Sequence, residues 1–284
     1  MKPFILILFL FALELSAQTV SLWRGTDEPH ASKVTLTAYL SAECDGTSVI
    51  VCPGGSYFWL DEQGEGVEVA QWLQGNGINA FVLHYRAAGF GAFFTHYRLV
   101  ARGKCYPDML SDLERAMAYL VDNAQTLGVD TNKIGLMGFS AGGHLVMSLP
   151  CYSKAQLPRP AFVAPIYPVV TMAASCTHTR SRRALMGEWR RFNKDMRDSL
   201  SIERHIPVDC PPVFLVNCVD DPVVDYHNSI LLDSALTANA IPHRYMQYQT
   251  GGHGFGVSAT KGTPECRPWK EEFLAWIKKV NCDQ

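Results

Sequence analysis

Alternating and continuous apolar runs along the chain predict its strands. Residues 34–40 alternate apolar and polar positions with a period of two, which is typical of a strand with one buried face. Other runs are continuously apolar, as in strands that are covered on both faces. These buried strands are predicted at residues 48–52, 78–83, 134–137, 161–166 and 213–217, and a further strand at 244–248.

Helical patterns separate these runs. Apolar residues recur at three- and four-residue steps from Pro107 to Gly128, and proline suits the first turn of a helix. Further helices are predicted at residues 66–74, 145–147, 230–240 and 269–280. Strands that alternate with helices form βαβ units, so the pattern predicts an α/β fold with a doubly wound, mainly parallel sheet. The chain shows no internal repeat or linker, and we expect one domain over residues 18–284.

Two segments fit no regular pattern. Residues 86–106 are rich in aromatic side chains, and residues 171–205 are rich in arginine. Both leave the predicted sheet near its functional edge, so we expect them to form walls or a lid over a pocket. Acidic residues dilute the basic run in the second segment, which we interpret as a solvated surface.

The first residues have the pattern of a targeting segment. Lys2 precedes an apolar run over residues 4–13, and small residues end the segment at Ala17. The run is shorter than the roughly 20 residues that a membrane-spanning helix needs. We therefore predict a cleaved signal peptide over residues 1–17 and a secreted or periplasmic protein without stable membrane insertion.

Composition narrows the function classes. The net charge of -2 implies no general attraction to nucleic acid or anionic membranes. Nine cysteines cannot all pair within one chain. Cys52 and Cys218 lie in apolar runs and are predicted to be buried, whereas Cys266 and Cys282 flank the last helix and could form a disulfide. No metal-binding motif is present, and we expect no metal and no organic cofactor.

A candidate nucleophile follows the strand at 134–137. Gly138-Phe139-Ser140-Ala141-Gly142 has the G-x-S-x-G pattern and leads into a predicted helix. A serine at the tip of so sharp a turn needs neighbours without a Cβ, which the two glycines supply. The alternative interpretation is a glycine-rich loop that only packs closely.

Candidates for an acid and a base follow later strands. Asp220 and Asp221 come directly after the strand at 213–217, with Asp225 as a weaker third acid. His253 lies in a glycine-rich loop after the strand at 244–248, whereas His84 and His144 are interpreted as structural. The order serine, acid, histidine is that of a hydrolase built on a doubly wound sheet.

Backbone N–H groups are expected to bind the oxyanion of such a reaction. Ala141, directly after the serine, supplies one candidate donor. The loop Pro53-Gly54-Gly55-Ser56-Tyr57 follows an earlier strand, and its small residues allow a close approach of substrate. We predict Gly55 and Ser56 as the other donors; the alternative is an ordinary Pro-Gly turn.

These motifs together resemble the α/β-hydrolase superfamily, and within it the small bacterial carbohydrate esterases similar to acetylxylan esterases. The resemblance covers nearly the whole chain after residue 17 and includes cap-like insertions. It implies that Ser140 is the nucleophile, His253 the base and Asp221 the acid, because an aspartate followed by Pro-Val-Val matches the family's acid turn. The chain has Pro-Gly-Gly-Ser where the related esterase and lipase branch has His-Gly-Gly-Gly.

The resulting hypothesis is a secreted serine esterase that removes acetyl or similar acyl groups from polysaccharide, oligosaccharide or small-molecule esters. A feruloyl esterase and an exopeptidase similar to the prolyl oligopeptidase catalytic domain are alternatives within the hydrolases. Residues 86–106 could form an acyl or aryl pocket as well as a platform for sugars. A hydrolase-fold binding module without activity is the alternative from another class.

Overall fold

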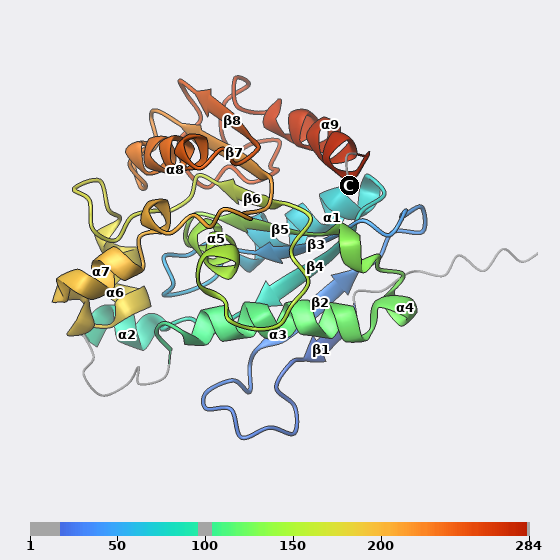
Figure 1. Ribbon diagram of the computed structural model, residues 1–284, viewed down its shortest axis with the longest axis horizontal. Coiled ribbons are helices and arrows are strands. Elements are labelled where there is room, and N and C mark those ends of the chain that lie inside the picture. Colours follow the sequence, from blue (N-terminus) through green and yellow to red (C-terminus); the bar gives the residue numbers. More distant parts are fainter. Residues whose placement is uncertain (1–17, 96–103, 283–284) are drawn as a thin grey trace, which may run out of the picture.

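Eight strands form one sheet in the computed structural model, which describes residues 18–95 and 104–282 (Figure 1). The predicted signal peptide, residues 1–17, lies outside the described residues. The strand order is β1-β2-β4-β3-β5-β6-β7-β8. The strands are β1 Gln18–Ser21, β2 Thr35–Tyr39, β3 Ser48–Cys52, β4 Asn79–His84, β5 Ile134–Phe139, β6 Val163–Ile166, β7 Val213–Cys218 and β8 His243–Tyr248.

The predicted mainly parallel sheet is confirmed. The strands from β3 to β8 pair in parallel, whereas β1 and β2 are antiparallel to their neighbours. Every residue of β3 and β5 is buried, which explains their continuous apolar runs. Strand β1 was not predicted because its four residues are mostly exposed and carry no apolar run.

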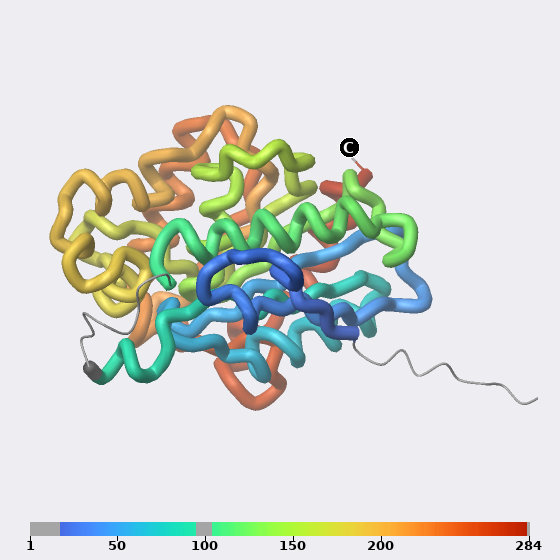
Figure 2. The backbone as a smooth tube through the Cα atoms, turned by 90° about the horizontal axis from the view of Figure 1, so that it is seen from below, coloured from blue at the N-terminus to red at the C-terminus, as the bar shows by residue number. Residues whose placement is uncertain are grey.

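Helices cover both faces of the sheet and divide the core into two layers. In β3, Ile50 and Cys52 contribute to one layer, and Val49 and Val51 to the other. One layer packs against α3, α5 and α8, and the other against α1 and α9. The helices run over Glu68–Gly75 (α1), Asp108–Asp122 (α3), Ala141–Tyr152 (α5), His227–Ala238 (α8) and Trp269–Cys282 (α9). Figure 2 shows α3 lying along the sheet.

The helix predicted from residue 107 to 128 is interrupted. Helix α3 ends at Asp122, and a separate turn, α4, runs over Ala124–Leu127. Gly128 closes α4 with a φ of 64°, a left-handed conformation that glycine adopts without strain. The apolar pattern therefore identified the helical region and missed the break within it.

The two segments expected to be irregular contain short helices. Helix α2, Phe90–Thr95, lies in the first, while residues 96–103 are outside the described residues. The second holds α6 (Thr179–Met186), α7 (Lys194–Ser199) and the 3-10 turns η3 (Arg190–Phe192) and η4 (Ile202–Arg204). Their few turns are too short for apolar periodicity to reveal them. Figures 1 and 2 show α2 gathered with α6 and α7 at one end of the molecule.

The arginines of the second segment are not a purely solvated surface, contrary to the prediction. Arg182 is half-buried and donates to the carbonyl of Met172. Arg183 has a side chain only 11% exposed and lies 2.6 Å from a carboxylate oxygen of Glu188. Arg180 and Arg190 are exposed, so the prediction holds for part of the run.

The cysteines are all free in this structure. Cys52 and Cys218 are fully buried, as predicted. The disulfide suggested between Cys266 and Cys282 is not formed. Cys282 is the last residue of helix α9 and Cys266 precedes the helix, whose 14 residues rise by about 20 Å, far beyond the span of a disulfide.

Candidate active site

Ser140 occupies the sharp turn between β5 and α5. Its φ of 54° and ψ of -116° are a strained conformation for a residue with a side chain. Close backbone packing fixes the turn: a Cβ on Gly138 would lie 2.1 Å from the carbonyl oxygen of Gly142, and one on Gly142 would lie 2.0 Å from that of Cys52. Both positions therefore require glycine, and the strand-turn-helix predicted around Ser140 is present.

Three side chains from separate loops form a hydrogen-bonded chain. Nε2 of His253 lies 3.0 Å from Oγ of Ser140, and Nδ1 of His253 lies 2.6 Å from Oδ2 of Asp221. The carboxylate of Asp221 is almost fully buried, and the side chain of His253 is 13% exposed. In a neutral imidazole, Nδ1–H donates to Asp221 and Nε2 accepts from the serine hydroxyl. This is the arrangement that lets a histidine take a proton from a serine.

The structure distinguishes the three candidate acids. Asp220 accepts hydrogen bonds from the backbone N–H groups of Gly251 (3.2 Å) and Gly252 (2.8 Å). Asp225 pairs with His227, 2.7 Å away, on the exposed surface. Among these aspartates, Asp221 is the one that contacts the candidate base.

The loop predicted to supply oxyanion donors packs against the serine. A Cβ on Gly54 would lie 2.8 Å from Cβ of Ser140. Gly55 and Ser56 both have positive φ angles, 135° and 58°, and a Cβ on Gly55 would lie 2.1 Å from the carbonyl oxygen of Trp59. No acceptor within the described part of the chain takes the N–H of Gly55 or Ser56. The loop thus brings free N–H groups close to the serine.

Two residues that the sequence did not single out lie beneath the site. Glu65, on the π-helical turn η1 (Glu62–Val67), is 4% exposed, and Tyr167, directly after β6, is 1% exposed. The Tyr167 hydroxyl donates to Oε1 of Glu65 at 2.8 Å. Burial raises the pKa of Glu65, and hydrogen bonds from Tyr167 and Gly54 act in the opposite direction. The only signal in the sequence is an acid between two glycines, soon after the oxyanion loop.

Two further histidines lie near the site. Nε2 of His144 lies 2.9 Å from the Leu200 carbonyl oxygen, and its Nδ1 lies 2.8 Å from the Tyr57 hydroxyl, so its role here is structural, as interpreted. Burial lowers the pKa of His144 to about 4. Burial, with the positive charge of Arg180, also lowers the pKa of His178 to about 4. Both imidazoles are therefore neutral near pH 7.

Aromatic rings extend outward from the oxyanion loop. The rings of Trp59 and Phe90 stack with centroids 5.4 Å apart and an interplanar angle of 14°. Phe93 contacts Trp59 edge to face at 5.4 Å. The guanidinium of Arg183 lies 4.9 Å from the Phe58 ring, and it donates to the Phe93 carbonyl at 2.7 Å. The described part of residues 86–106 thus packs against Phe58 and Trp59, whose N–H groups donate to the Gly55 carbonyl of the loop predicted to bind the oxyanion.

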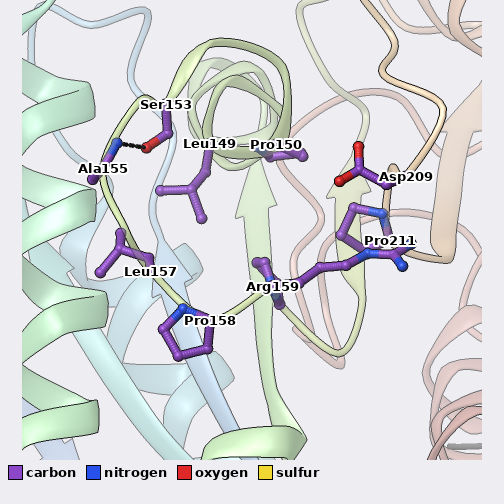
Figure 3. A pocket seen from close by; sticks show the side chains of 10 residues that line it. Leu149, Pro150, Ser153, Ala155, Leu157, Pro158, Arg159, Asp209 and Pro211 are labelled. Carbon is purple, nitrogen blue, oxygen red and sulfur yellow. Dashed lines mark hydrogen bonds between the residues drawn. The ribbon is translucent and has the colours of Figure 1, made fainter.

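A separate pocket lies at the opposite edge of the sheet. This cavity has a volume of about 180 Å³. Figure 3 shows Arg159 and Asp209 on facing loops that line it. These loops precede β6 and β7, whereas Ser140, Asp221 and His253 follow strands. No group of acidic, histidine and cysteine side chains within residues 18–95 and 104–282 is arranged to hold a metal ion. None of the helices in those ranges is long and apolar enough to cross a membrane.

Comparisons with known proteins agree with this architecture. Residues 48–159 match the BD-FAE family model. An acetylxylan esterase from Xylanibacter ruminicola is 27% identical over 90% of this chain and 50% of its own length. Endo-1,4-beta-xylanase B from Butyrivibrio fibrisolvens is 30% identical over 74% of this chain and 32% of its own. The chain therefore spans about half the length of the acetylxylan esterase and about a third of the length of the xylanase.

Solved structures share the whole fold. An acetyl ester-xyloside bifunctional hydrolase from Caldicellulosiruptor lactoaceticus matches with a TM-score of 0.79 and 29% identity, over 93% of this chain and 96% of the other. The carboxylesterase Cest-2923 from Lactobacillus plantarum matches with a TM-score of 0.74 and 19% identity, over 94% and 97%, and shows likeness of fold alone. The resemblance noted from the sequence is confirmed: the chain belongs to the α/β-hydrolase superfamily and is similar to its carbohydrate esterases.

Proposed function

We propose that this protein is a serine esterase that removes acetyl or similar acyl groups from carbohydrate esters. The observation that carries the proposal is the hydrogen-bonded chain from Asp221 through His253 to Ser140. Ser140 lies on a strained turn, beside a loop whose N–H groups at Gly55 and Ser56 are free. A purely structural cluster needs neither the strain nor the unpaired donors.

In the first half of the reaction, Oγ of Ser140 attacks the ester carbonyl carbon while Nε2 of His253 takes the hydroxyl proton. Asp221 holds the ring in the tautomer that accepts this proton, and its charge stabilises the imidazolium. The oxyanion of the tetrahedral intermediate accepts hydrogen bonds from N–H groups of Ala141, Gly55 and Ser56. The bond to the alcohol then breaks, and His253 returns its proton to the departing sugar oxygen.

In the second half, water replaces the alcohol. His253 takes a proton from water as the water oxygen attacks the acyl carbon attached to Ser140. The same N–H groups bind the second oxyanion, and collapse of this intermediate breaks the bond to Oγ. The proton returns to the serine, and the carboxylic acid is released. Every step uses residues of the chain itself.

The substrate class rests on the relatives. One curated relative is an acetylxylan esterase, and one solved neighbour is an acetyl ester-xyloside bifunctional hydrolase. These names support an acetylated carbohydrate as the substrate of this chain. The shallow burial of His253 fits a site that a bulky sugar ester reaches from solvent.

Kinetics of the Ser140→Ala variant test the proposal. We expect the purified chain to hydrolyse p-nitrophenyl acetate and to release acetate from acetylated xylooligosaccharides, and the variant to lose both activities by about 10⁴-fold or more. A fluorophosphonate probe should label Ser140 in the parent protein. Equal turnover by the parent and the variant would contradict the serine mechanism, and an unlabelled, inactive parent would favour a binding module.

A second candidate substrate carries an aromatic acyl group, such as a feruloyl ester. The stacked rings of Trp59 and Phe90 and the neighbouring Phe93 beside the oxyanion loop favour it. A flat apolar surface binds an aryl ring more strongly than an acetyl methyl group. The ratio of kcat/KM for feruloylated and acetylated oligosaccharides decides between the two.

We also propose that the chain is exported. The support is the basic, apolar and small-residue pattern of residues 1–17. Expression of the full chain in a bacterial host, followed by mass measurement of the periplasmic protein, tests this. Cleavage near residue 17 is the expected result, and a full-length cytoplasmic product would contradict it.

A further inference from the structure

Glu65 connects to the oxyanion loop through a backbone hydrogen bond. Its Oε2 accepts from the N–H of Gly54 at 2.7 Å, one residue before the predicted donor Gly55. The loop in turn holds the start of η1, the turn that carries Glu65, because the Asp61 N–H donates to the Gly54 carbonyl at 2.9 Å. The two peptide units on either side of Gly54 are therefore each held by a hydrogen bond, one through its N–H and the other through its carbonyl.

The other oxygen of Glu65 connects to the histidine loop. Oε1 accepts from the Tyr167 hydroxyl at 2.8 Å, and the oxygen of that hydroxyl accepts from the N–H of Gly256 at 3.0 Å. The ring of Tyr167 also lies against His253, with centroids 4.7 Å apart. One buried carboxylate thus joins loops that are about 200 positions apart in the sequence and that meet at Ser140.

The hydrogen bonds favour the ionised form of this carboxyl group. The N–H of Gly54 can only donate, so Oε2 of Glu65 accepts. Oε1 accepts from the Tyr167 hydroxyl, whose oxygen in turn accepts from Gly256. A carboxylate fills both acceptor positions. Burial raises the pKa of Glu65, and the hydrogen bonds from Tyr167 and Gly54 act against that shift.

From this geometry we infer that Glu65 is a positioning residue of the active site: its carboxylate orients the oxyanion loop directly and, through Tyr167, the loop that carries His253. The inference rests on the proposed function for its catalytic consequence. Donors aimed at a developing charge must be fixed before the reaction, since reorienting them during it would raise the barrier. Ser140, His253 and Asp221 supply the chemistry, and Glu65 sets the position of the donors relative to them.

Glu65→Gln removes the charge and keeps the shape. The new amide nitrogen must face either the N–H of Gly54, where two donors meet, or Tyr167, whose proton then loses its acceptor. Tyr167→Phe breaks the link at the other end and leaves the bond from Gly54 to Glu65 intact. Glu62→Gln is the matched control: it lies on the same turn, is mostly exposed, and pairs with His84 on the surface.

Two measurements on the full-length mature protein test the inference. Steady-state kinetics with p-nitrophenyl acetate, normalised to folded protein, should show kcat reduced by at least about tenfold in Glu65→Gln with KM changed by less than about threefold. Amide hydrogen exchange followed by NMR should be faster at Gly54 and Gly256 in Glu65→Gln, and faster at Gly256 with Gly54 still protected in Tyr167→Phe. Glu62→Gln should match the parent protein in both measurements.

The outcomes separate this inference from the proposed function. Unchanged exchange at Gly54 in Glu65→Gln, or an unchanged kcat per folded molecule, would overturn the positioning role. If Glu65→Gln does not fold, the exchange pattern of Tyr167→Phe decides the question alone. If Ser140→Ala is as active as the parent, the proposed function fails, and the exchange experiment still decides whether Glu65 holds the two loops.

Discussion

Asp221 contacts the imidazole of His253, with Oδ2 2.6 Å from Nδ1, while the adjacent Asp220 binds the backbone of the loop that carries this histidine. Two neighbouring carboxylates at the end of β7 therefore fix different degrees of freedom. Asp221 sets the tautomer and the rotation of the ring. Asp220 holds the glycine-rich segment from Gly251 to Gly252, which has no side chains of its own to pack.

Substitution of the two aspartates by asparagine should separate these roles. Asp221→Asn presents an amide to Nδ1 and favours the wrong tautomer, so we expect kcat to fall by about 10⁴-fold. Asp220→Asn keeps one acceptor for Gly252 and loses the charge. We expect its free energy of unfolding to fall by about 1–3 kcal/mol, and its kcat to fall much less than that of Asp221→Asn. Ester hydrolysis and urea unfolding of both variants check this. A larger loss of kcat in Asp220→Asn would mean that the acid has been assigned to the wrong residue.

The turn at Ser140 should not tolerate a methyl group. In Gly142→Ala the new Cβ would overlap the Cys52 carbonyl, which belongs to the buried central strand β3 and cannot move away. We expect a loss of about 3 kcal/mol or more in unfolding free energy. Gly75→Ala is the control, since no atom lies within 4 Å of its added Cβ. A Gly142→Ala protein as stable as the control would show that the turn is looser than its geometry indicates.

Acid should destabilise the protein through His144. Its pKa is lowered from 6.5 to about 4 in the folded state, so the unfolded chain binds a proton first as the pH falls. The stability that the neutral ring provides is complete above pH 6.5 and is lost as the pH falls from 6.5 to about 4, by about 3 kcal/mol in total.

His144→Gln isolates this contribution. The amide accepts from Tyr57 and donates to Leu200 as the imidazole does, and it does not titrate. Urea unfolding at pH 7, 5.5 and 4.5 should show a smaller loss of stability in the variant than in the parent. Because the pKa of His178 is also lowered, only the difference between the two proteins is informative. Parallel stability curves would contradict the assignment.

The contrast between predicted and unforeseen residues has a physical basis. Strands β3 and β5 were predictable because burial on both faces demands an unbroken apolar run. Ser140, Asp221 and His253 could be proposed from the sequence because each lies in a loop that follows a strand, so the topology brings them to one edge. Tyr167 also follows a strand, yet an aromatic side chain there is typical of a core residue, and its polar contact with Glu65 spans 102 positions. Chain-local patterns carry no information on such a pairing.

The prediction of a solvated surface for the arginine-rich segment was partly wrong for a related reason. An arginine in a sequence suggests a solvent-exposed charge. When the side chain is half-buried, however, its guanidinium can donate to backbone carbonyls and stack on aromatic rings. Arg183 does both, with two carbonyls of α2 and the rings of Phe58 and Phe93. Only the arrival of α2 beside α6, which the linear pattern does not contain, makes such a position favourable.

Arg183 should therefore control the aromatic wall of the site. Arg183→Ala removes the donors to Ala92 and Phe93 and the cation beneath the rings, so α2 should separate from the oxyanion loop. We expect faster proteolysis within residues 90–95, and a fall in kcat/KM that is at least about tenfold greater for aryl-acyl esters than for p-nitrophenyl acetate.

Two matched variants test the mechanism of that effect. Arg183→Lys keeps the charge and loses the guanidinium that reaches the carbonyls of both Ala92 and Phe93, so its rate of proteolysis should match that of Arg183→Ala. Arg180→Ala removes an exposed arginine that also lies over Phe93, at 5.5 Å, but that donates no hydrogen bond to the described backbone of α2. It should leave proteolysis unchanged. If Arg180→Ala loosens α2 as much as Arg183→Ala does, ring stacking rather than the carbonyl hydrogen bonds holds the wall in place.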